Sequence, residues 1–534
     1  MGSFLKEARG KHRLHRPVLP AFSAGRLADC FAMGYTTRRK QSAAPETRPA
    51  GKGASMRVLE QLEPQGVFRF FEELCAIPHG SRNCQAVSDW CVAFARERGL
   101  EHYQDQAGNV ILIQEATPGY EAADPILLQG HLDMVCEKEP GCTKDMEKEG
   151  LDLYVEDGCV RARGTTLGGD DGIAVAMALA ILDDRTIPHP RLEVVFTTEE
   201  EIGMMGAVAL DASPLRGRKL LNLDSEAEGV FTVSCAGGSM ARCALPVTRT
   251  AFAGTALAVR VSGLVGGHSG TEIHKGRANA CMVLGRVLQA MGAETELRLV
   301  TARGGGKDNA IPMESSAQVV ASDEAAARQA AEQMAAALTR EYAVADPGLR
   351  VEVTACEVSE TPMDRASTEK ALCMLTCLPN GIQAMSMDIP GLVQTSLNLG
   401  ILATEADSLT ATFCVRSSLG SQKEMLHRRL RALMAQLGGT VSISGDYPAW
   451  EYRQDSPFRD LMTEIFWEQY GSAPQIEAIH AGVECGILAG KLPGLDCVSV
   501  GPNLLDIHTP RERMDIASVQ RVWRFVLEVL KRSK

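Results

Sequence analysis

The stretch LEVVFTTEEEIG (192–203) decides how the fold of this 534-residue chain is interpreted. It begins with a mainly apolar run, LEVVF, of the length expected for a buried strand, and it then passes into two threonines and three glutamates. Acidic residues are poor strand formers and are costly to bury. The glutamates therefore indicate the end of the strand, at an edge of a sheet where polar side chains can gather.

Strand and helix patterns alternate around this stretch, from residue 56 to residue 235. NVILIQEA (109–116) and PILLQG (125–130) are typical of strands, whereas VFRFFEELCAI (67–77) and DGIAVAMALAIL (171–182) are typical of helices. Alternation of this kind predicts an α/β domain with a largely parallel sheet.

The pattern changes after residue 235. ALAVRVS (256–262) alternates between apolar and polar positions, which is typical of half-exposed strands, and helices separate the strands. Two comparable lobes are plausible here, although no sequence repeat is evident. Apolar blocks return from about residue 451. We therefore expect an α/β domain made of residues 56–235 and 451–534, interrupted by an α+β domain at 236–450.

Composition excludes several classes of function. The net charge of −12 argues against general nucleic-acid binding and against binding to an anionic membrane surface. The apolar run IAVAMALAIL (173–182) is too short to span a bilayer. The 16 cysteines contain no C-x-x-C, so we expect mostly buried thiols in a reducing, cytoplasmic compartment.

The first 55 residues differ in charge from the rest of the chain. They carry 11 Lys/Arg against 3 Asp/Glu, whereas the remainder carries 44 against 64. No apolar segment typical of a secretory signal is evident there. Two interpretations stay open: a basic targeting or binding arm, or a largely disordered start with the working protein beginning at Met56.

Four short stretches hold an unusual density of residue types that bind metals. Each follows a strand or opens a helix: LLQGHLDMV (127–135), LGGDDGI (167–173), TTEEEIG (197–203) and LNLDSE (221–226). Loops at the carboxyl ends of parallel strands share one crevice. Carboxylates gathered at one such edge would repel one another unless a cation held them.

Each piece also has a plain structural explanation. Asp170 and Asp171 could cap a helix, the glutamate run could be a solvated turn, and Asp224 could end a strand. His131 and Asp133 are two residues apart, so that in an extended chain both side chains leave the same face, and the carboxylate could orient the imidazole on a metal.

The combination of motifs resembles the M20 family of dinuclear metallopeptidases. The resemblance is carried in order by HLDMV (131–135), GDDGIAVAMALAIL (169–182), EEEIGMMGA (199–207) and LLNLDSE (220–226). It runs from about Met56 to the C-terminus and includes GGHSG (266–270), GRANA (276–280), NAIP (309–312), HAGVECG (480–486) and IHTPRERM (507–514).

The resemblance implies two divalent cations, with Zn²⁺ as the default and Co²⁺ or Mn²⁺ as alternatives. The ligands that it implies are His131 and Asp224 for one cation, Glu201 and His508 for the other, and Asp170 for both.

The resemblance also assigns roles to neighbouring carboxylates. Asp133 would support His131, and Glu200 would be the general base. Glu199 would be structural or solvated. Asp171 departs from the family pattern, where asparagine is expected more often, and it adds a carboxyl group near the cations.

Residues in and after the inserted domain are candidates for binding substrate. Family members use a histidine of the inserted domain to stabilise the oxyanion, which implies this role for His268. Asn309 and Arg416 could bind substrate, the arginine by clamping a terminal carboxylate. His480 and Glu484 could meet the amine or side chain of the substrate. Structural roles remain open for all five, because glycine-flanked histidines, strand arginines and helix N-termini are common features of folded domains.

The resemblance thus implies a cytoplasmic metallodipeptidase with a zinc-peptidase-type α/β catalytic domain and an inserted α+β lid domain. The closest likeness within the family is to members that release C-terminal histidine from dipeptides. We expect short peptides as substrates, with no nucleic-acid or membrane partner, and a homodimer is an option. The alternatives are another M20 hydrolase (a broad dipeptidase, a tripeptidase or an N-acyl amino acid deacylase) and a catalytically dead binding scaffold.

Overall fold

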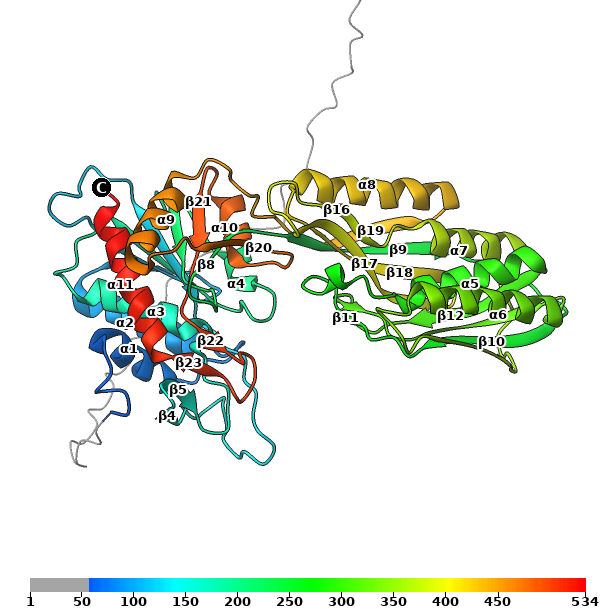
Figure 1. Ribbon diagram of the computed structural model, residues 1–534, viewed down its shortest axis with the longest axis horizontal. Helices are drawn as coiled ribbons and strands as arrows, with labels where there is room; N and C mark the ends of the chain where they lie inside the picture. Colours follow the sequence, from blue (N-terminus) through cyan, green and yellow to red (C-terminus); the bar gives the residue numbers. More distant parts are fainter. Residues whose placement is uncertain (1–56) are drawn as a thin grey trace, which may run out of the picture. The chain divides into compact units, whose positions relative to one another are not determined.

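The computed structural model describes residues 57–534, whose helices and strands are labelled in Figure 1. The predictions for residues 1–55 and for a start at Met56 lie outside the described residues. No helix between residues 57 and 534 has the length and apolar character needed to cross a membrane. All 15 cysteines in this range are free thiols, and ten of them are buried.

A mixed eight-stranded sheet is formed by strands from both sides of the predicted insertion. In spatial order its strands are β1 (Glu101–Gln104), β2 (Val110–Gln114), β6 (Leu192–Thr197), β3 (Ile126–His131), β7 (Lys219–Asn222), β21 (Asp496–Ser499), β8 (Val230–Cys235) and β20 (Gln475–Ile479). β6, β3, β7 and β21 run parallel, whereas β1, β2 and β6 pair antiparallel. The continuous apolar runs of the sequence follow from this parallel centre, because its strands are covered on both faces. The predicted α/β class is confirmed.

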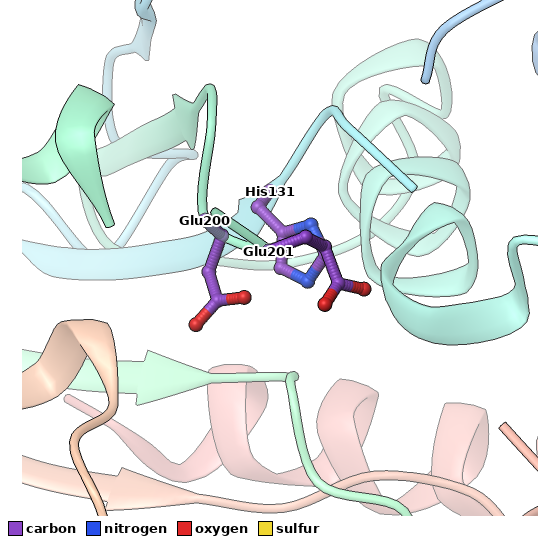
Figure 2. A group of neighbouring side chains, drawn as sticks. All are labelled: His131, Glu200 and Glu201. Carbon is purple, nitrogen blue, oxygen red and sulfur yellow. The ribbon is translucent and has the colours of Figure 1, made fainter. Parts of the chain in front are cut away.

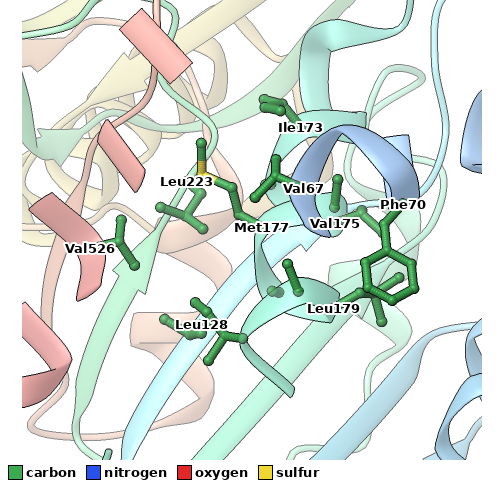
Figure 3. Close-up of a cluster of buried hydrophobic side chains, with 14 of the residues drawn as sticks. Val67, Phe70, Leu128, Ile173, Val175, Met177, Leu179, Leu223 and Val526 are labelled. Carbon is green, nitrogen blue, oxygen red and sulfur yellow. The ribbon is translucent and has the colours of Figure 1, made fainter. Parts of the chain in front are cut away.

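Successive residues of the central strands enter two different cores. Ile126 and Leu128 belong to a large core that also includes α3, whereas Leu127, between them, belongs to a smaller core on the other face. Figure 3 shows part of the large core, with Leu128, Met177 and Val526. The helices of this α/β part are α1 (Gln65–Cys75), α2 (Gln85–Arg98), α3 (Gly169–Asp183), α4 (Met205–Ala209), α9 (Pro457–Tyr470), α10 (Glu484–Lys491) and α11 (Ile516–Arg532).

Helix α3 is the centre of the large core. It packs against β3 on one side and against α1 on the other, so 13 of its 15 residues are buried. A helix that is covered on all sides needs apolar residues all round, which explains the unbroken run IAVAMALAIL. Packing of α3 fixes the position of its N-terminal residues at the edge of the sheet.

Residues 237–447 form a second sheet with nine strands, which we call the insert sheet. Its strands in spatial order are β15 (Arg350–Ala355), β10 (Thr255–Ser262), β14 (Ser315–Ala321), β12 (Leu297–Gly304), β17 (Val393–Thr404), β18 (Ser408–Ser417), β9 (Gly237–Pro246) and β19 (Thr440–Tyr447), with β16 (Gly381–Met385) paired to β17. Its helices are α5 (Ala280–Glu294), α6 (Glu324–Glu341), α7 (Arg365–Cys377) and α8 (Gly420–Leu437).

The two strand–helix–strand sets expected in this region are halves of the one insert sheet. They meet where β12 pairs with β17 through a single residue pair, Gly304 and Leu402. Both halves contribute to one hydrophobic core, which is distinct from the cores of the eight-stranded sheet. Strands such as β10 alternate between buried and partly exposed residues, because the helices cover only one face.

The chain enters and leaves the insert sheet through adjacent segments. Cys235, at the end of β8, and Trp450, after β19, exchange two backbone hydrogen bonds of 3.0 and 3.2 Å. The remaining elements are short: β4 (Leu153–Glu156), β5 (Cys159–Ala162), β11 (Gly267–His268), η1 (Ile273–Lys275), β13 (Ala310–Ile311), β22 (Leu504–Leu505) and β23 (Arg513–Asp515).

Candidate metal centre

Strand order brings histidine and carboxylate side chains to one edge of the eight-stranded sheet. β3 and β6 are parallel neighbours, so His131 at the end of β3 lies beside the turn that carries Glu200 and Glu201 (Figure 2). β7 flanks β3 on its other side, and Asp224 follows it. The edge is therefore built from the loops that follow three neighbouring strands, as expected for sites in parallel sheets.

Asp170, in the first turn of α3, lies between two groups of side chains. One carboxylate oxygen, Oδ1, is 3.2 Å from Nε2 of His131, and Asp224 is 3.7 Å from the same nitrogen. The other oxygen, Oδ2, is 3.1 Å from Nε2 of His508, which is also 3.0 Å from Glu201. In each group the possible ligand atoms lie within 4.8 Å of one another.

The donor atoms of these two groups fit a pair of divalent cations that share Asp170. Each group offers one imidazole nitrogen and carboxylate oxygens, the set that zinc and similar borderline cations accept. The structure therefore brings together all five side chains for which the sequence predicts metal binding. Their assignment as ligands stays a prediction.

Asp133 orients both His131 and the glutamate turn. Its backbone carbonyl accepts a hydrogen bond of 2.9 Å from Nδ1 of His131, which fixes the ring with Nε2 facing Asp170. Its buried carboxylate accepts bonds from the backbone N–H groups of Glu200 and Glu201 and from the hydroxyl of Ser81. Asp133 thus connects the ends of β3 and β6 in the geometry expected of a support for metal ligands.

The three consecutive glutamates point to different partners. Glu199 has a positive φ of 58°, and both of its carboxylate oxygens accept a bond from the backbone N–H of Arg82. Glu201 lies beside His508. Burial raises the pKa of Glu200 to about 7, against an opposing effect of His131 and with a contribution from Glu201. A carboxylate whose pKa is raised toward neutrality is suited to proton transfer.

Asp171 is buried behind His131. Its carboxyl group accepts a hydrogen bond of 3.2 Å from the backbone N–H of His131. Burial raises the pKa of Asp171 well above its usual value, which favours the neutral carboxyl group. Its carboxyl group therefore lies behind the ring of His131 and belongs to neither group of ligand-type side chains.

A second group of predicted site residues surrounds Gly270. A side chain at Gly270 would meet the carbonyl oxygen of His480 at 2.5 Å, the ring of His268 at 3.0 Å and Nε of Arg416 at 3.2 Å. Nε of Arg416 and Nδ1 of His480 are buried and have no hydrogen-bond partner in the described part of the chain. Burial and the charge of Arg416 lower the pKa of His480 to about 3, so its imidazole is neutral.

A pocket of about 420 Å³ adjoins this second group and is lined in part by Gly270, Thr271 and His480. Asn309 is exposed, and its backbone carbonyl accepts a bond of 2.8 Å from the N–H of Ser269. Unpartnered polar groups beside a pocket are typical of a binding site. Substrate binding by these residues stays a prediction.

Comparisons with known proteins decide the family. A family model described as Peptidase family M20/M25/M40 matches residues 127–532, which is more than half of the chain. The chain belongs to this family. The resemblance predicted from the motifs is therefore confirmed, and so is the membership of the chain in a family of peptidases.

Two relatives are similar to this M20 chain over nearly the whole of their own length. The cytosol non-specific dipeptidase of Escherichia coli (strain K12) is 35% identical over 480 residues, which cover 89% of this chain and 99% of that protein. The crystal structure of aminoacylhistidine dipeptidase from Vibrio alginolyticus matches with a TM-score of 0.84 and 34% identity, and covers 89% of this chain and 97% of that one. The aminopeptidase PepT of Bacillus cereus, at 16% identity and a TM-score of 0.52, shares the fold.

Glu484 lies beneath the metal centre of this M20 protein. It is completely buried at the start of α10, and one carboxylate oxygen accepts bonds of 2.5 Å from both Gln129 and Thr197. Gln129 in turn accepts a bond of 2.5 Å from Asn222. Burial raises the pKa of Glu484 to about 8, with a contribution from Glu200. This network joins β3, β6 and β7 directly below the residues that they deliver to the edge.

Ser81, Gln129 and Asn222 are not among the site residues predicted from the sequence. All three act through contacts between segments that are far apart in the chain. Polar residues inside apolar strand patterns, such as Gln129 in PILLQG and Asn222 in KLLNLD, are the one signal that could have identified two of them, because a buried amide needs hydrogen-bond partners.

Proton competition at His508 predicts how metal binding depends on pH. When no cation is bound, hydrogen bonds to Asp170 and Glu201 raise the pKa of His508 to about 10, so a cation must displace a proton from the ring. We expect the apparent affinity for Zn²⁺ to rise with pH between about pH 6 and about pH 8, by about tenfold per pH unit for each proton released. Titration against a chromophoric chelator measures it.

His508→Ala provides the control for this experiment. The variant should bind Zn²⁺ more weakly and show a shallower dependence on pH, since one proton fewer is released. An affinity of the unmodified protein that does not change with pH would contradict the placement of His508 at the metal centre.

Proposed function

We propose that this chain is a dinuclear metallodipeptidase that hydrolyses dipeptides ending in histidine. The observation that carries the proposal is the carboxylate of Asp170, whose two oxygens face His131 and His508 in separate groups of ligand-type side chains. One carboxylate that serves two adjacent ligand sets is the arrangement that a two-metal hydrolase needs.

Different residues of the centre are proposed to carry out different steps of the hydrolysis. Two divalent cations bound there would polarise the scissile carbonyl and lower the pKa of a water molecule. Glu200 accepts the proton of the attacking water and then delivers it to the leaving amine. Asp133 holds the backbone of Glu200, which keeps that carboxylate at a fixed position beside His131.

The group around Gly270 is proposed to hold the ends of the substrate. Arg416 provides a buried guanidinium with an unpartnered Nε, which suits the C-terminal carboxylate of a dipeptide. His268 is proposed to stabilise the oxyanion. Neutral His480, with Asn309 and Glu484 as further candidates, is proposed to meet the polar parts of the substrate. For Glu484 its burial and its bonds to Gln129 and Thr197 argue more for support of the site.

The known relatives support two ranges of substrate. The name of the Vibrio alginolyticus protein refers to aminoacylhistidine dipeptides, whereas that of the Escherichia coli protein refers to non-specific dipeptidase activity in the cytosol. Both are similar to this chain to nearly the same extent. A broad dipeptidase is therefore the second candidate, and a cytoplasmic location is proposed for either. We also propose residues 236–450 as a lid between two parts of one catalytic domain, 56–235 and 451–534.

Hydrolysis of a panel of substrates by the full-length chain tests the proposal. The panel contains Xaa-His and β-alanyl-His dipeptides, dipeptides without histidine, a tripeptide and an N-acetyl amino acid, each with Zn²⁺, Co²⁺ or Mn²⁺ added. We expect metal-dependent cleavage with the highest kcat/KM for Xaa-His. Equal cleavage of all dipeptides would favour the broad dipeptidase. Cleavage of only the tripeptide or the acetyl compound would overturn the dipeptidase assignment, and no cleavage by a protein with two bound cations would favour a binding scaffold.

A further inference from the structure

Glu512 is a buried carboxylate that none of the proposed chemical steps uses. It lies in the turn that joins His508 to β23, and it is 3% exposed. Burial of a carboxylate is costly unless several donors compensate for the lost water. The residues that surround Glu512 must therefore supply those donors.

Four consecutive backbone N–H groups at the start of α3 donate to Glu512. Oε2 accepts bonds of 2.7 Å from Leu167 and 3.0 Å from Gly168. Oε1 accepts bonds of 2.8 Å from Gly169 and 3.4 Å from Asp170. The carboxylate thus satisfies four N–H groups of the segment that leads into the regular part of α3, where the backbone angles of Asp170 and Asp171 are not helical.

The residues on both sides of this contact belong to the metal centre. Asp170 is the side chain shared by the two ligand groups, and its own backbone N–H is among the four donors. His508 is four residues before Glu512, and its ring contacts Asp170 and Glu201. One carboxylate therefore fixes the loop that carries Asp170 relative to the turn that carries His508, although the two are more than 330 residues apart in the sequence.

We propose that Glu512 is a positioning residue for the dinuclear centre. It sets the distance between Asp170 and His508 and so shapes the cation site formed by Asp170, Glu201 and His508, which we call the second site. This inference rests on the proposed metal-binding function. A residue that only satisfied these N–H groups could come from any segment of the chain. Glu512 comes from the turn that also carries His508, so loss of its bonds would free Asp170 to move relative to His508.

Zn²⁺ binding by Glu512→Gln tests the inference. The glutamine side chain is nearly isosteric, but its NH₂ group would face backbone N–H donors, so at least one of the two pairs of bonds is lost. We expect affinity at the second of two Zn²⁺ sites to fall by about 10- to 100-fold, the usual range for groups that support metal ligands. Competition titration with a chelator, starting from metal-stripped full-length protein, measures stoichiometry and affinity without reference to activity.

Glu512→Asp and Glu228→Gln are the matched variants. Aspartate keeps the charge but is one methylene shorter, so it should recover part of the affinity. Glu228 is a partly buried carboxylate of the same part of the protein that binds Arg521 and Tyr470 and no predicted ligand. Glu228→Gln should lower the unfolding temperature and leave both Zn²⁺ affinities unchanged. A structural role alone would make Glu512→Gln behave in the same way and would overturn the inference.

Gly169→Ala perturbs the same contact through the segment that donates the hydrogen bonds. A methyl group there would lie 3.2 Å from Oε1 of Glu512, which displaces the carboxylate slightly without removing it. Should Glu512→Gln fail to fold, this variant must show the weakened second site, and wild-type affinity in it would overturn the inference. Failure of the unmodified protein to bind two Zn²⁺ would instead refute the proposed function on which the inference rests.

Discussion

Glu200→Gln should lower kcat for dipeptide hydrolysis by about 10²- to 10⁴-fold, the usual contribution of a general base. Glutamine has nearly the same size but cannot accept a proton from water. The backbone N–H of Glu200 would still donate to Asp133, so the turn should keep its shape. We therefore expect KM and Zn²⁺ stoichiometry to stay close to those of the unmodified protein while kcat falls.

Steady-state kinetics with Zn²⁺-loaded protein measure this effect, with Glu199→Gln as the control. Glu199 is the adjacent carboxylate, but it binds the backbone of Arg82, and its replacement should change kcat little. Equal losses of kcat in Glu200→Gln and Glu199→Gln would refute the special role of Glu200.

A general base acts only when deprotonated, so activity of the unmodified protein should fall as pH drops through the pKa of Glu200. That pKa is about 7 without cations, and positive charge nearby lowers it.

Removal of the cations should abolish activity and also destabilise the folded protein. Asp170, Asp224 and Glu201 lie close together at one edge, and a bound cation offsets their repulsion. A ligand that binds only the folded state stabilises it by about 4 kcal/mol when present at about 1,000 times its Kd. Chelation should therefore lower the unfolding temperature, and added Zn²⁺ should restore both stability and activity.

The thermal unfolding of chelated and Zn²⁺-loaded protein gives this comparison directly. Asp170→Asn is the matched variant, because it removes the charge of the shared carboxylate and should make the unfolding temperature insensitive to Zn²⁺. An unfolding temperature of the unmodified protein that ignores both chelator and Zn²⁺ would contradict the two-cation centre.

The sequence predicted the α/β class and the edge of the sheet because both follow from local patterns. Apolar runs such as LEVVF end in polar residues where the chain leaves the core, and parallel strands place these ends together. The family motifs added an assignment of roles that spacing alone does not provide. The three glutamates meet different partners because the backbone at Glu199 is left-handed, which no periodicity indicates.

The supporting contacts of Glu512 and Glu484 could not be predicted because their partners are distant in the chain. Glu512 accepts bonds from residues about 340 positions earlier, and Glu484 reaches Gln129 across 355 positions. In the sequence both are single acidic residues near a predicted helix or turn, which are common on protein surfaces. Their burial becomes evident only when the packing of α3 and α10 is known.

The paired crossing at Cys235 and Trp450 bears on how this architecture could arise. Two hydrogen-bonded backbone segments lie about 5 Å apart, so the more than 200 residues between them begin and end at nearly the same point. A gene segment that encodes them can be gained, exchanged or shortened without moving the strands on either side. Changes in the length of the insert sheet therefore need not disturb the eight-stranded sheet that carries the ligand-type side chains.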